Sequence, residues 1–484
     1  MAQDRPEQPP TPDEAVRLLL ADDRATASDQ GDAAALAKAL ALFRPALVLA
    51  AAFMQRLHVP PLGYRAELQK RMTASPIAAD ATAHAGPMAA AWRIAVDAAT
   101  EENAAARSLL DLLSFMAPAP LPRSVLTADP SMPGDDPAGV AAVEALAGFG
   151  LIDATPEAIS MPRAVRELAI ADLGATGESR LSAFMRLMAR AMPPQPADEA
   201  DVAPTIALLP HAVAAARIGE AAAVDLPTAA RLFRDLALFY RSVGHSADAE
   251  YFLVRAVGIG RTAIGRDHPE IAEWLGILGE MHVAKRRFGQ AVPALETALS
   301  IMKQNGRRKE PRLALWLQNL ADAYRGSQRL DDAEKAYAYL MTSASINDRI
   351  DRHMVDHCRE GLAEIHMARG DFDKAEDILV ELLTEAEASR NRDELLPFAR
   401  SYKLADLYKK SGQHEKAEPL LARLQQQNAG FTPTPEHALK LLKAFGNDAM
   451  VDELTRRDGL SRSGRRIPTN MSLAACLATL RPPP

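Results

Sequence analysis

Apolar residues recur with the spacing of amphipathic helices in the stretch that precedes a long repeated region. Residues 90–125 form such a run, which ends in a proline-rich turn, and a second apolar helix is expected at residues 138–150. Residues 151–162 alternate instead, as a short β-hairpin does, and residues 163–174 return to helical spacing. The pattern predicts helices interrupted by one hairpin.

The second half of the chain repeats one pattern at a constant period. Each unit has a leucine, a small residue, a tyrosine or histidine three residues later, a loop, and a second apolar helix that carries an alanine. The alanines of the second helices lie 42 residues apart, at Ala249, Ala291, Ala333, Ala375 and Ala417. Because a single helical hairpin cannot bury its apolar stripe, such units are expected to stack into a solenoid.

Residue types at fixed repeat positions predict how the hairpins pack. A leucine and a small neighbour allow close approach of two helices, and a ring fills the adjacent space. Glycine is expected to end three first helices, and proline to lie in the first turn of two second helices, where its missing N–H costs little. The leucines are Leu236, Leu278, Leu320, Leu362 and Leu404, and their small neighbours are Ala237, Gly279, Ala321, Ala363 and Ala405. The rings are Tyr240, His282, Tyr324, His366 and Tyr408. The glycines are Gly244, Gly370 and Gly412, and the prolines are Pro293 and Pro419.

This unit resembles the tetratricopeptide repeat, and its LADLY and AEPLL strings are similar to the kinesin-light-chain subtype. The resemblance covers residues 226–427. It implies an all-α solenoid of helical hairpins that binds a protein or peptide along its concave face. In that subtype asparagines on this face clamp a peptide backbone, and only Asn319 matches that feature.

The segment before the repeats resembles a second family. The strings ENAAARSLLDLLSFMAPAPLPRSVL and AVEALAGFGLID are similar to the winged-helix part of bacterial NB-ARC proteins, which are signal-transduction ATPases with numerous domains (STAND proteins). Residues 206–216, IALLPHAVAAA, are similar to the helix that opens their repeat arrays, and residues 13–75 resemble their helical lid. The resemblance implies lid, winged helix and repeats in that order.

The nucleotide-binding motif of that family has no counterpart in this sequence. A phosphate-binding loop has the pattern GxxxxGK[ST], and residues 260–266, the nearest string, lack both the lysine and the hydroxyl residue. Only residues 1–12 precede the lid-like helices, so we expect no nucleotide-binding sheet. The family's lid has a Gly-x-Pro turn, and of this motif the present sequence has only the proline, Pro45. In the winged helix, Pro162 replaces the histidine that senses phosphate in the family. We therefore expect no nucleotide and no other cofactor.

The chain is expected to divide in the order of these resemblances. The predicted parts are residues 1–12, disordered; 13–75, a helical lid-like segment; 88–176, a winged-helix-like domain with a short β-hairpin; 200–428, a solenoid of five 42-residue repeats with opening helices; 429–456, a capping helix; and 457–484, a disordered basic and proline-rich tail.

Composition narrows the class of protein further. The 484 residues are 5% aromatic, and 56 basic against 63 acidic residues give a net charge of −7, which disfavours general affinity for nucleic acid or anionic membranes. Two cysteines, Cys358 and Cys476, cannot form a disulfide framework. No secretory leader is visible, and the apolar run Pro45–Met54 is short against the roughly 20 residues that span a bilayer. We expect a cytoplasmic protein.

No residue pattern indicates catalysis or a metal centre. His353 and His357 are four residues apart near Cys358 and His366, but nothing supplies the HExxH pattern or fixes a third ligand. The expected recognition helix of the winged-helix-like domain, residues 138–149, has no lysine or arginine to contact DNA phosphates. We expect no enzyme, no metal and no nucleic-acid partner.

The first helices of the repeats should line the concave face, and we expect the partner to bind there. The face is predicted to be basic at its N-terminal end and mixed or acidic further along. The candidate residues are Arg231, Arg234, Arg241, Glu273, Glu280, Gln318, Asn319, Asp322, Arg325, His357, Glu360, Glu364, Tyr402, Asp406 and Lys409, and Leu238 is expected on the same face.

The function expected from these features is that of a noncatalytic interaction scaffold or regulatory adaptor. One alternative is a STAND-type signalling regulator that works with a separate ATPase chain and docks it through the lid-like segment. A second is a transcriptional regulator that uses the winged helix, and the weakest is a hydrolase hidden in the alanine-rich N-terminal half.

Overall fold

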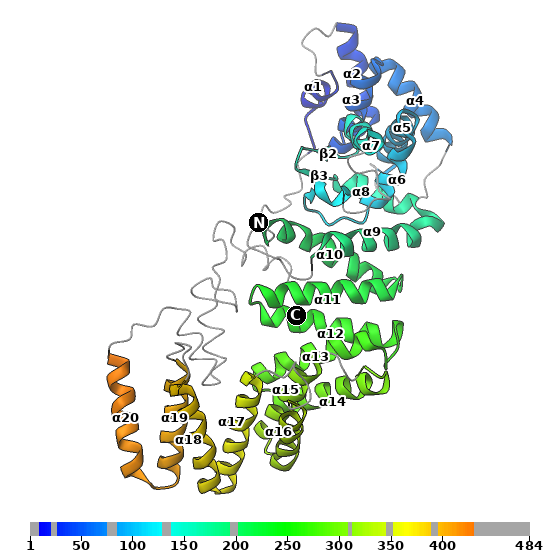
Figure 1. Ribbon diagram of the computed structural model, residues 1–484. Coiled ribbons are helices and arrows are strands. Elements are labelled where there is room, and N and C mark those ends of the chain that lie inside the picture. Colours follow the sequence, from blue (N-terminus) through cyan, green and yellow to red (C-terminus); the bar gives the residue numbers. More distant parts are fainter. Residues whose placement is uncertain are drawn as a thin grey trace. The chain divides into compact units, whose positions relative to one another are not determined.

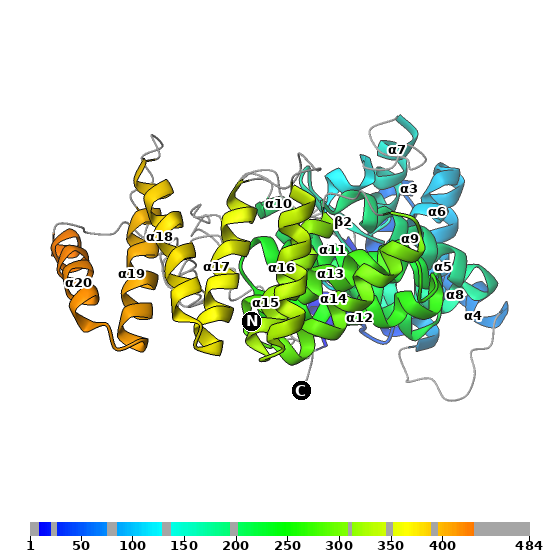
Figure 2. The same ribbon diagram turned by 60° about the horizontal axis from the view of Figure 1, so that its bottom comes forward.

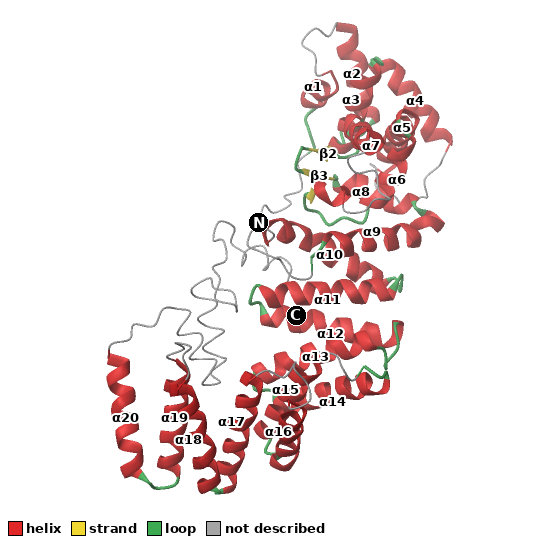
Figure 3. Ribbon diagram, viewed as in Figure 1, coloured by secondary structure: helices red, strands yellow, loops and turns green. Residues whose placement is uncertain are grey.

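The computed structural model describes residues 9–20, 27–74, 85–127, 137–193, 202–307, 312–344, 352–388 and 395–429. The chain divides into two compact units, Met1–Leu236 and Ala237–Pro484, and the division falls within helix α11 (Leu226–Ser242). Both units are built mainly of helices (Figure 3). The expected all-α fold class is confirmed.

Four helices form the first part of unit 1. They are α1 (Pro12–Leu20), α2 (Ala27–Ala39), α3 (Arg44–Leu57) and α4 (Pro61–Ala74). Helix α1 packs on α2 and α3, and α2 packs on α4. Leu40, Leu47 and Tyr64 are almost completely buried among them, so the apolar stripes of these short helices form a shared core.

The helical run predicted at residues 90–125 is two helices, not one. Helix α5 (Ala85–Glu102) ends where the Asn103 side chain accepts a hydrogen bond from the backbone N–H of Ala105 at 2.8 Å, and α6 (Ala104–Leu113) begins there. Asparagine in this role satisfies an N–H that the first turn of a helix leaves unpaired. The apolar spacing continues through the break, which is why periodicity alone missed it.

A small sheet lies in the middle of unit 1. The predicted hairpin is confirmed as β2 (Asp153–Ala154) and β3 (Ala158–Ser160), which pair antiparallel. Strand β1 (Leu121–Pro122) adds to the other side of β3, giving the order β1-β3-β2. The sequence did not predict β1, because two residues after a proline-rich turn carry no alternation. The nearby helical elements are η1 (Arg123–Thr127), α7 (Pro137–Gly148), α8 (Arg163–Asp172) and η2 (Gly174–Thr176).

A buried histidine fastens the proline-rich turn to a later helix of unit 1. Helix α9 (Gly177–Ala191) packs on α10 (Val202–Ala221), which carries the fully buried His211. The backbone N–H of Ala117 donates to His211 Nδ1 at 3.1 Å, and Nε2 lies 3.2 Å from the carbonyl oxygen of Pro120. Nδ1 therefore accepts and Nε2 carries the proton, and burial lowers the pKa of His211 to about 4.

Helix α10 is also the one described helix whose length and composition would allow it to cross a membrane. However, 61% of its apolar window is buried inside the fold. An apolar helix that is covered on most of its surface is typical of a protein core.

The repeats form successive antiparallel hairpins, as Figures 1 and 2 show. We call the first helix of each hairpin helix A and the second helix B. The A helices are α11, α13 (Pro269–Ala284), α15 (Arg312–Gly326), α17 (Arg352–Arg369) and α19 (Leu395–Lys410). The B helices are α12 (Ser246–Ala263), α14 (Phe288–Gln304), α16 (Leu330–Ala344), α18 (Phe372–Ala388) and α20 (His414–Ala429).

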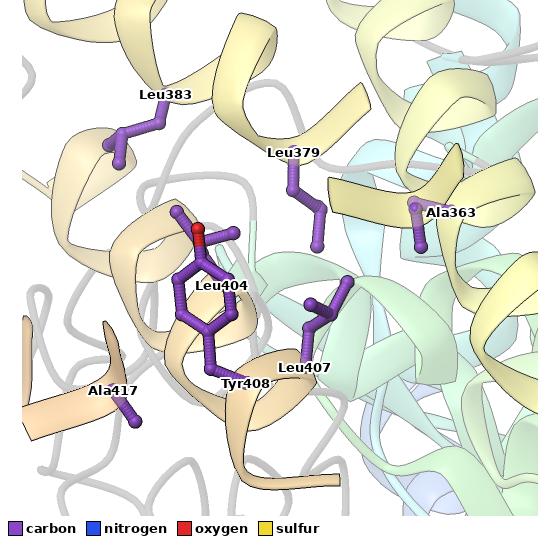
Figure 4. Packing of buried hydrophobic residues seen from close by; sticks show 8 residues of the cluster. Ala363, Leu379, Leu383, Leu404, Leu407, Tyr408 and Ala417 are labelled. Atoms are coloured by element: carbon purple, nitrogen blue, oxygen red, sulfur yellow. The ribbon is translucent and has the colours of Figure 1, made fainter. Parts of the chain in front are cut away.

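Most of the predicted packing positions of the repeats are buried. All five helix B alanines are at most 2% exposed. A Cβ atom added to Gly279 would lie 2.5 Å from Leu295 Cγ, so only glycine fits at that contact. Figure 4 shows the same arrangement in the last two hairpins, where Leu404 and Tyr408 pack between α18 and α20. The small-residue positions are thus confirmed as core, as are three of the ring positions, Tyr240, His282 and Tyr408, whereas the rings of Tyr324 and His366 are only half-buried.

The turn after each helix A contains one residue with left-handed backbone. Gly244, Gly370 and Gly412 have φ of +86°, +85° and +77°, which confirms the predicted glycine caps. Arg286 and Gln328 occupy the same repeat position with φ of +55° and +64°. The turn geometry therefore persists where glycine is absent, although other residues adopt it at an energetic cost.

The predicted position of two prolines is wrong by one turn. Pro293 and Pro419 lie inside α14 and α20, each as the sixth residue rather than in the first turn, because these helices begin before the repeat alanine. A proline there removes one backbone hydrogen bond. Both prolines are exposed, so water can reach the carbonyl group that is left without its partner.

The C-terminal predictions lie outside the described residues. These are the capping helix after Ala429, the basic tail and Cys476. At the other end, α1 begins at Pro12, and residues 1–8 are likewise outside the described part of the chain.

Candidate partner-binding surface on the A helices

All of the residues predicted to contact a partner except Leu238 are half-buried or exposed. Arg231 and Arg234 belong to unit 1, and the others belong to unit 2. We call the surface formed by the unit 2 residues, from Arg241 on α11 to Lys409 on α19, the A-helix face. The prediction that Leu238 is exposed beside them is wrong, because Leu238 is 9% exposed and belongs to the core.

A hydrogen-bonded contact joins the first three A helices at Glu280. Arg241 Nη1 on α11 lies 3.2 Å from Glu280 Oε2 on α13, and Trp316 Nε1 on α15 donates to Glu280 Oε1 at 3.0 Å. The indole of Trp316 lies over Gly276, where an added Cβ would come within 2.2 Å of the ring. Glycine at this position lets α15 approach α13.

A second contact joins α15 to α17 at Asp322. Its carboxylate accepts a hydrogen bond from Tyr337 at 2.5 Å and lies 3.0 Å from His357 Nε2. Burial alone would raise the pKa of Asp322, but the hydrogen bond with His357 and the charges of His357 and Arg325 outweigh it, so this pKa lies below its ordinary value. Arg325 also forms an ion pair with Glu364 on α17.

A third contact joins α17 to α19. Lys403 Nζ lies 2.7 Å from Glu360 Oε2 and 3.0 Å from Glu364 Oε1. The Arg400 side chain is 3% exposed, and it pairs with Asp356 at 2.7 Å and donates to the Leu382 carbonyl at 2.7 Å. We call the three contacts together the polar seam, because they connect the A helices from α11 to α19.

Sequence reasoning found about half of the polar seam. It missed Trp316, Tyr337, Asp356, Arg400 and Lys403. A signal for the seam does exist in the sequence: Arg241 and Glu280 are 39 residues apart, as are Arg325 and Glu364. Opposite charges at nearly the repeat period indicate ion pairs between neighbouring repeats.

The remaining residues of the A-helix face are not tied into the seam. The side chains of Glu273, Gln318 and Lys409 make no ion pair or hydrogen bond with another described residue. Asp406 pairs only with Lys410 of its own helix, at 2.8 Å, within the described part of the chain. Large apolar side chains are also exposed on the A helices, with Leu315 40% and Tyr402 49% exposed.

The histidines and cysteine of α17 have other partners or are buried. His357 is held by Asp322, and His366 Nδ1 lies 3.6 Å from Asp371 Oδ2. No group of three or more His, Cys, Asp or Glu side chains in the described ranges could hold a metal ion. Burial raises the pKa of the Cys358 thiol to about 12, so the thiol stays protonated and is a poor nucleophile.

Two segments of the chain match family profiles described as tetratricopeptide repeat: residues 228–304 and residues 359–394. These matches lie within the five hairpins described above. The chain therefore contains tetratricopeptide repeats. A search among curated proteins finds no match.

Solved structures similar to this chain come from several organisms. Kinesin-light-chain repeats from Podosopora anserina are 22% identical, with 42% of this chain and 97% of that chain covered and a TM-score of 0.35. BtubC from P. vanneervenii is 20% identical, with 48% and 94% covered and a TM-score of 0.37. A STAND protein with a tetratricopeptide repeat sensor from Pyrococcus horikoshii is 13% identical, with 92% and 74% covered and a TM-score of 0.30.

Proposed function

We propose that this chain is a noncatalytic interaction protein whose A-helix face binds a protein or peptide partner. The observation that carries the proposal is the polar seam. It connects five consecutive A helices, while Leu315, Gln318 and Tyr402 remain at least partly exposed among them. A surface whose helices are already fixed loses little conformational entropy when a partner binds.

The tetratricopeptide repeats support the same proposal, since repeat solenoids commonly present extended binding surfaces. Exposed apolar side chains surrounded by ordered polar groups are typical of protein interfaces, where a few apolar or aromatic residues provide most of the binding energy. Leu315 and Tyr402 are the residues of this kind on the described A helices.

We also propose that unit 1 contains the lid-like segment, residues 13–75, and a winged-helix-like domain, residues 88–176. The β2–β3 hairpin between α7 and α8 supports the second assignment. A role in reading DNA is not favoured, because α7 contains no lysine or arginine and one glutamate, Glu144.

Binding through the A-helix face is tested with the full chain as bait in an extract of its source cells. Leu315→Asp places a charge on the A-helix face, and Val380→Asp places the same charge on helix B at nearly the same exposure, 41% against 40%. We expect the Leu315 variant to lose specific prey proteins in quantitative mass spectrometry and the Val380 variant to keep them. Both variants should show cooperative melting.

Equal prey in all three samples would contradict the proposal, and so would loss of prey in the Val380 variant alone. Asp322 is unsuitable for this test, because its pairs with Tyr337 and His357 make its removal a stability change as well.

A further inference from the structure

We propose that the part of the A-helix face formed by α15, α17 and α19 binds an uncharged partner segment that carries apolar side chains. This chemistry of the partner rests on the proposed function and adds to it. It follows from charged side chains that pair with one another across the three helices, which we call the ion-pair network. Its members are Asp322, Arg325, Glu364, Lys403, Glu360, Arg400 and Asp356.

The first half of the ion-pair network runs from α15 across α17 to α19. Asp322 Oδ1 lies 3.5 Å from Arg325 Nη2 on the same helix, and Arg325 forms an ion pair with Glu364 on α17. Glu364 Oε1 in turn lies 3.0 Å from Lys403 Nζ on α19. Arg325 and Glu364 therefore each have two neighbours of opposite charge.

The second half of the network returns from α19 to α17. Lys403 Nζ lies 2.7 Å from Glu360 Oε2, and Glu360 Oε1 lies 3.3 Å from Arg400 Nε. Arg400 Nη2 ends the series 2.7 Å from Asp356 Oδ2. Burial alone would raise the pKa of Glu360, but the charges of Lys403 and Arg400 and their hydrogen bonds outweigh it, so this pKa lies below its ordinary value. The carboxylate stays ionised inside the network.

Charges of alternating sign give a charged partner residue little to gain. The side chains of the network are between 3% and 33% exposed, so a residue that covers them loses much of its own hydration. It also meets both signs of charge at close range, and it has to displace an existing ion pair before it can form one of its own. A neutral segment avoids both costs and leaves every pair in place.

Uncharged side chains of the same helices supply the contacts for such a segment. Leu315 on α15 is 40% exposed and Tyr402 on α19 is 49% exposed, and Gln318 is half-buried. The Asn319 side-chain amide donates one hydrogen bond to the Leu315 carbonyl of its own helix at 2.9 Å, so one of its two N–H groups is already used. Recognition then depends mainly on apolar contacts, which provide most of the binding energy at many interfaces.

The probes for this chemistry are three fluorescein-labelled peptides that differ only in charge. Neighbouring packed helices lie about 8–10 Å apart, so a segment over α15, α17 and α19 spans about 20 Å, or about six extended residues. Each peptide has about ten residues, capped ends, a leucine and a phenylalanine in a Gly/Ser/Thr background, and two central positions that vary. These positions are Gln in the neutral peptide, Glu in the acidic peptide and Lys in the basic peptide.

Fluorescence anisotropy with the full chain measures the three affinities. We expect the neutral peptide to bind about fivefold or more tightly than either charged peptide. Raising the NaCl concentration from about 50 mM to about 500 mM should change its affinity less than twofold, because no charge of the partner is screened. Leu315→Asp should weaken the neutral peptide and Val380→Asp should not, which places the peptide on the A-helix face.

Opening the network from either side provides the stronger test. Lys403→Met leaves Glu360 and Glu364 with one cation fewer, so the basic peptide should gain about threefold in affinity relative to the acidic one. Glu364→Gln removes the carboxylate that Arg325 and Lys403 share, so the acidic peptide should gain by a similar factor. Misfolding cannot produce two changes of opposite sign.

The matched controls break ion pairs that lie between B helices. Lys416→Met removes the cation 2.8 Å from Glu376, and Glu387→Gln removes the carboxylate 2.8 Å from Arg423. Neither control should change the order of the three affinities.

Three results would overturn the uncharged-segment proposal. They are a charged peptide that binds as tightly as the neutral one, the same charge preference in Lys403→Met and Glu364→Gln, or no saturable binding of any peptide up to about 1 mM. If prey proteins are still lost on Leu315→Asp, the binding face stands and only its charge chemistry fails. Prey retained in that variant means that the proposed function itself fails.

Discussion

Two buried titratable side chains of unit 1 give opposite pH dependences of stability. The pKa of His211 is lowered to about 4, mainly by burial and against the effect of its bond to Pro120. The pKa of Asp235 on α11 is raised to about 6, mainly by burial and against the charges of Arg234 and Arg231. Protonation as the pH falls is therefore unfavourable in the folded state at His211 and favourable at Asp235.

For His211 we expect stability to be lost on the acid side. The unfolded chain takes up the proton near pH 6.5 and the folded chain only near pH 4, so the free energy of unfolding falls by about 3 kcal/mol between these values. Urea unfolding of the wild type and of His211→Gln at several pH values measures this loss. The stability difference between the two proteins should shrink as the pH falls, and a constant difference would contradict the assignment.

For Asp235 we expect the opposite dependence. Its folded pKa of about 6 exceeds the ordinary value of 3.8, so the stability it contributes when protonated is lost as the pH rises through this window, by about 3 kcal/mol. Asp235→Asn removes the titration. Relative to the wild type, this variant should gain stability between pH 4 and pH 7. A difference in the free energy of unfolding between the two proteins that does not change with pH would show that Asp235 does not titrate there.

At the scale of single helices, substitutions at two glycines can distinguish the effect of close packing on stability from the effect of helix propensity. In α13, Gly276→Ala would place a Cβ within 2.4 Å of two atoms of the Trp316 ring, so the indole and its bond to Glu280 must shift. We expect a loss of about 1–3 kcal/mol and a changed tryptophan fluorescence spectrum.

The control for this substitution is Gly258 in α12, where nothing lies within 4 Å of an added Cβ. Gly258→Ala should be neutral or stabilise by up to about 1 kcal/mol, because alanine is the better helix former. If both variants melt alike in thermal denaturation, close contact between α13 and α15 is not what requires glycine at position 276.

The same scale shows what the sequence could and could not predict. The 42-residue period predicted which residues of each hairpin are core, and burial of all five helix B alanines confirms it. Helix starts were less accurate, as Pro293 shows, because periodicity does not mark where a helix begins. The break at Asn103 was missed because a capping side chain acts locally while the apolar pattern continues.

The sequence predicted which face the candidate residues lie on, but not which side chains they pair with. Repeat register places Glu273, Glu280 and Asp322 on one face, and the structure leaves all three at least partly exposed. Which of them has a partner depends on side chains one repeat away, such as Trp316, or on a helix B, such as Tyr337. Such contacts are set by packing between hairpins, which a single repeat pattern does not contain.

At the scale of the whole repeat array, stability is expected to behave as a sum over neighbouring hairpins. Each repeat contacts mainly the next one, so losing one interface loosens the repeats beyond it without unfolding those before it. The buried Arg400 tests this idea, because it joins α19 to Asp356 on α17 and to the Leu382 carbonyl on α18.

Arg400→Met removes the cation and leaves Asp356, 8% exposed, without its buried partner. Breaking a buried ion pair in this way costs about 3–5 kcal/mol, whereas Arg423→Met, which breaks an exposed pair with Glu387, should cost less than about 1 kcal/mol. Hydrogen exchange should become faster in α19 and α20 and stay unchanged in α13 and α14. Faster exchange in all of these helices would show that the hairpins unfold as one cooperative unit, and Arg400 would then stabilise the entire array.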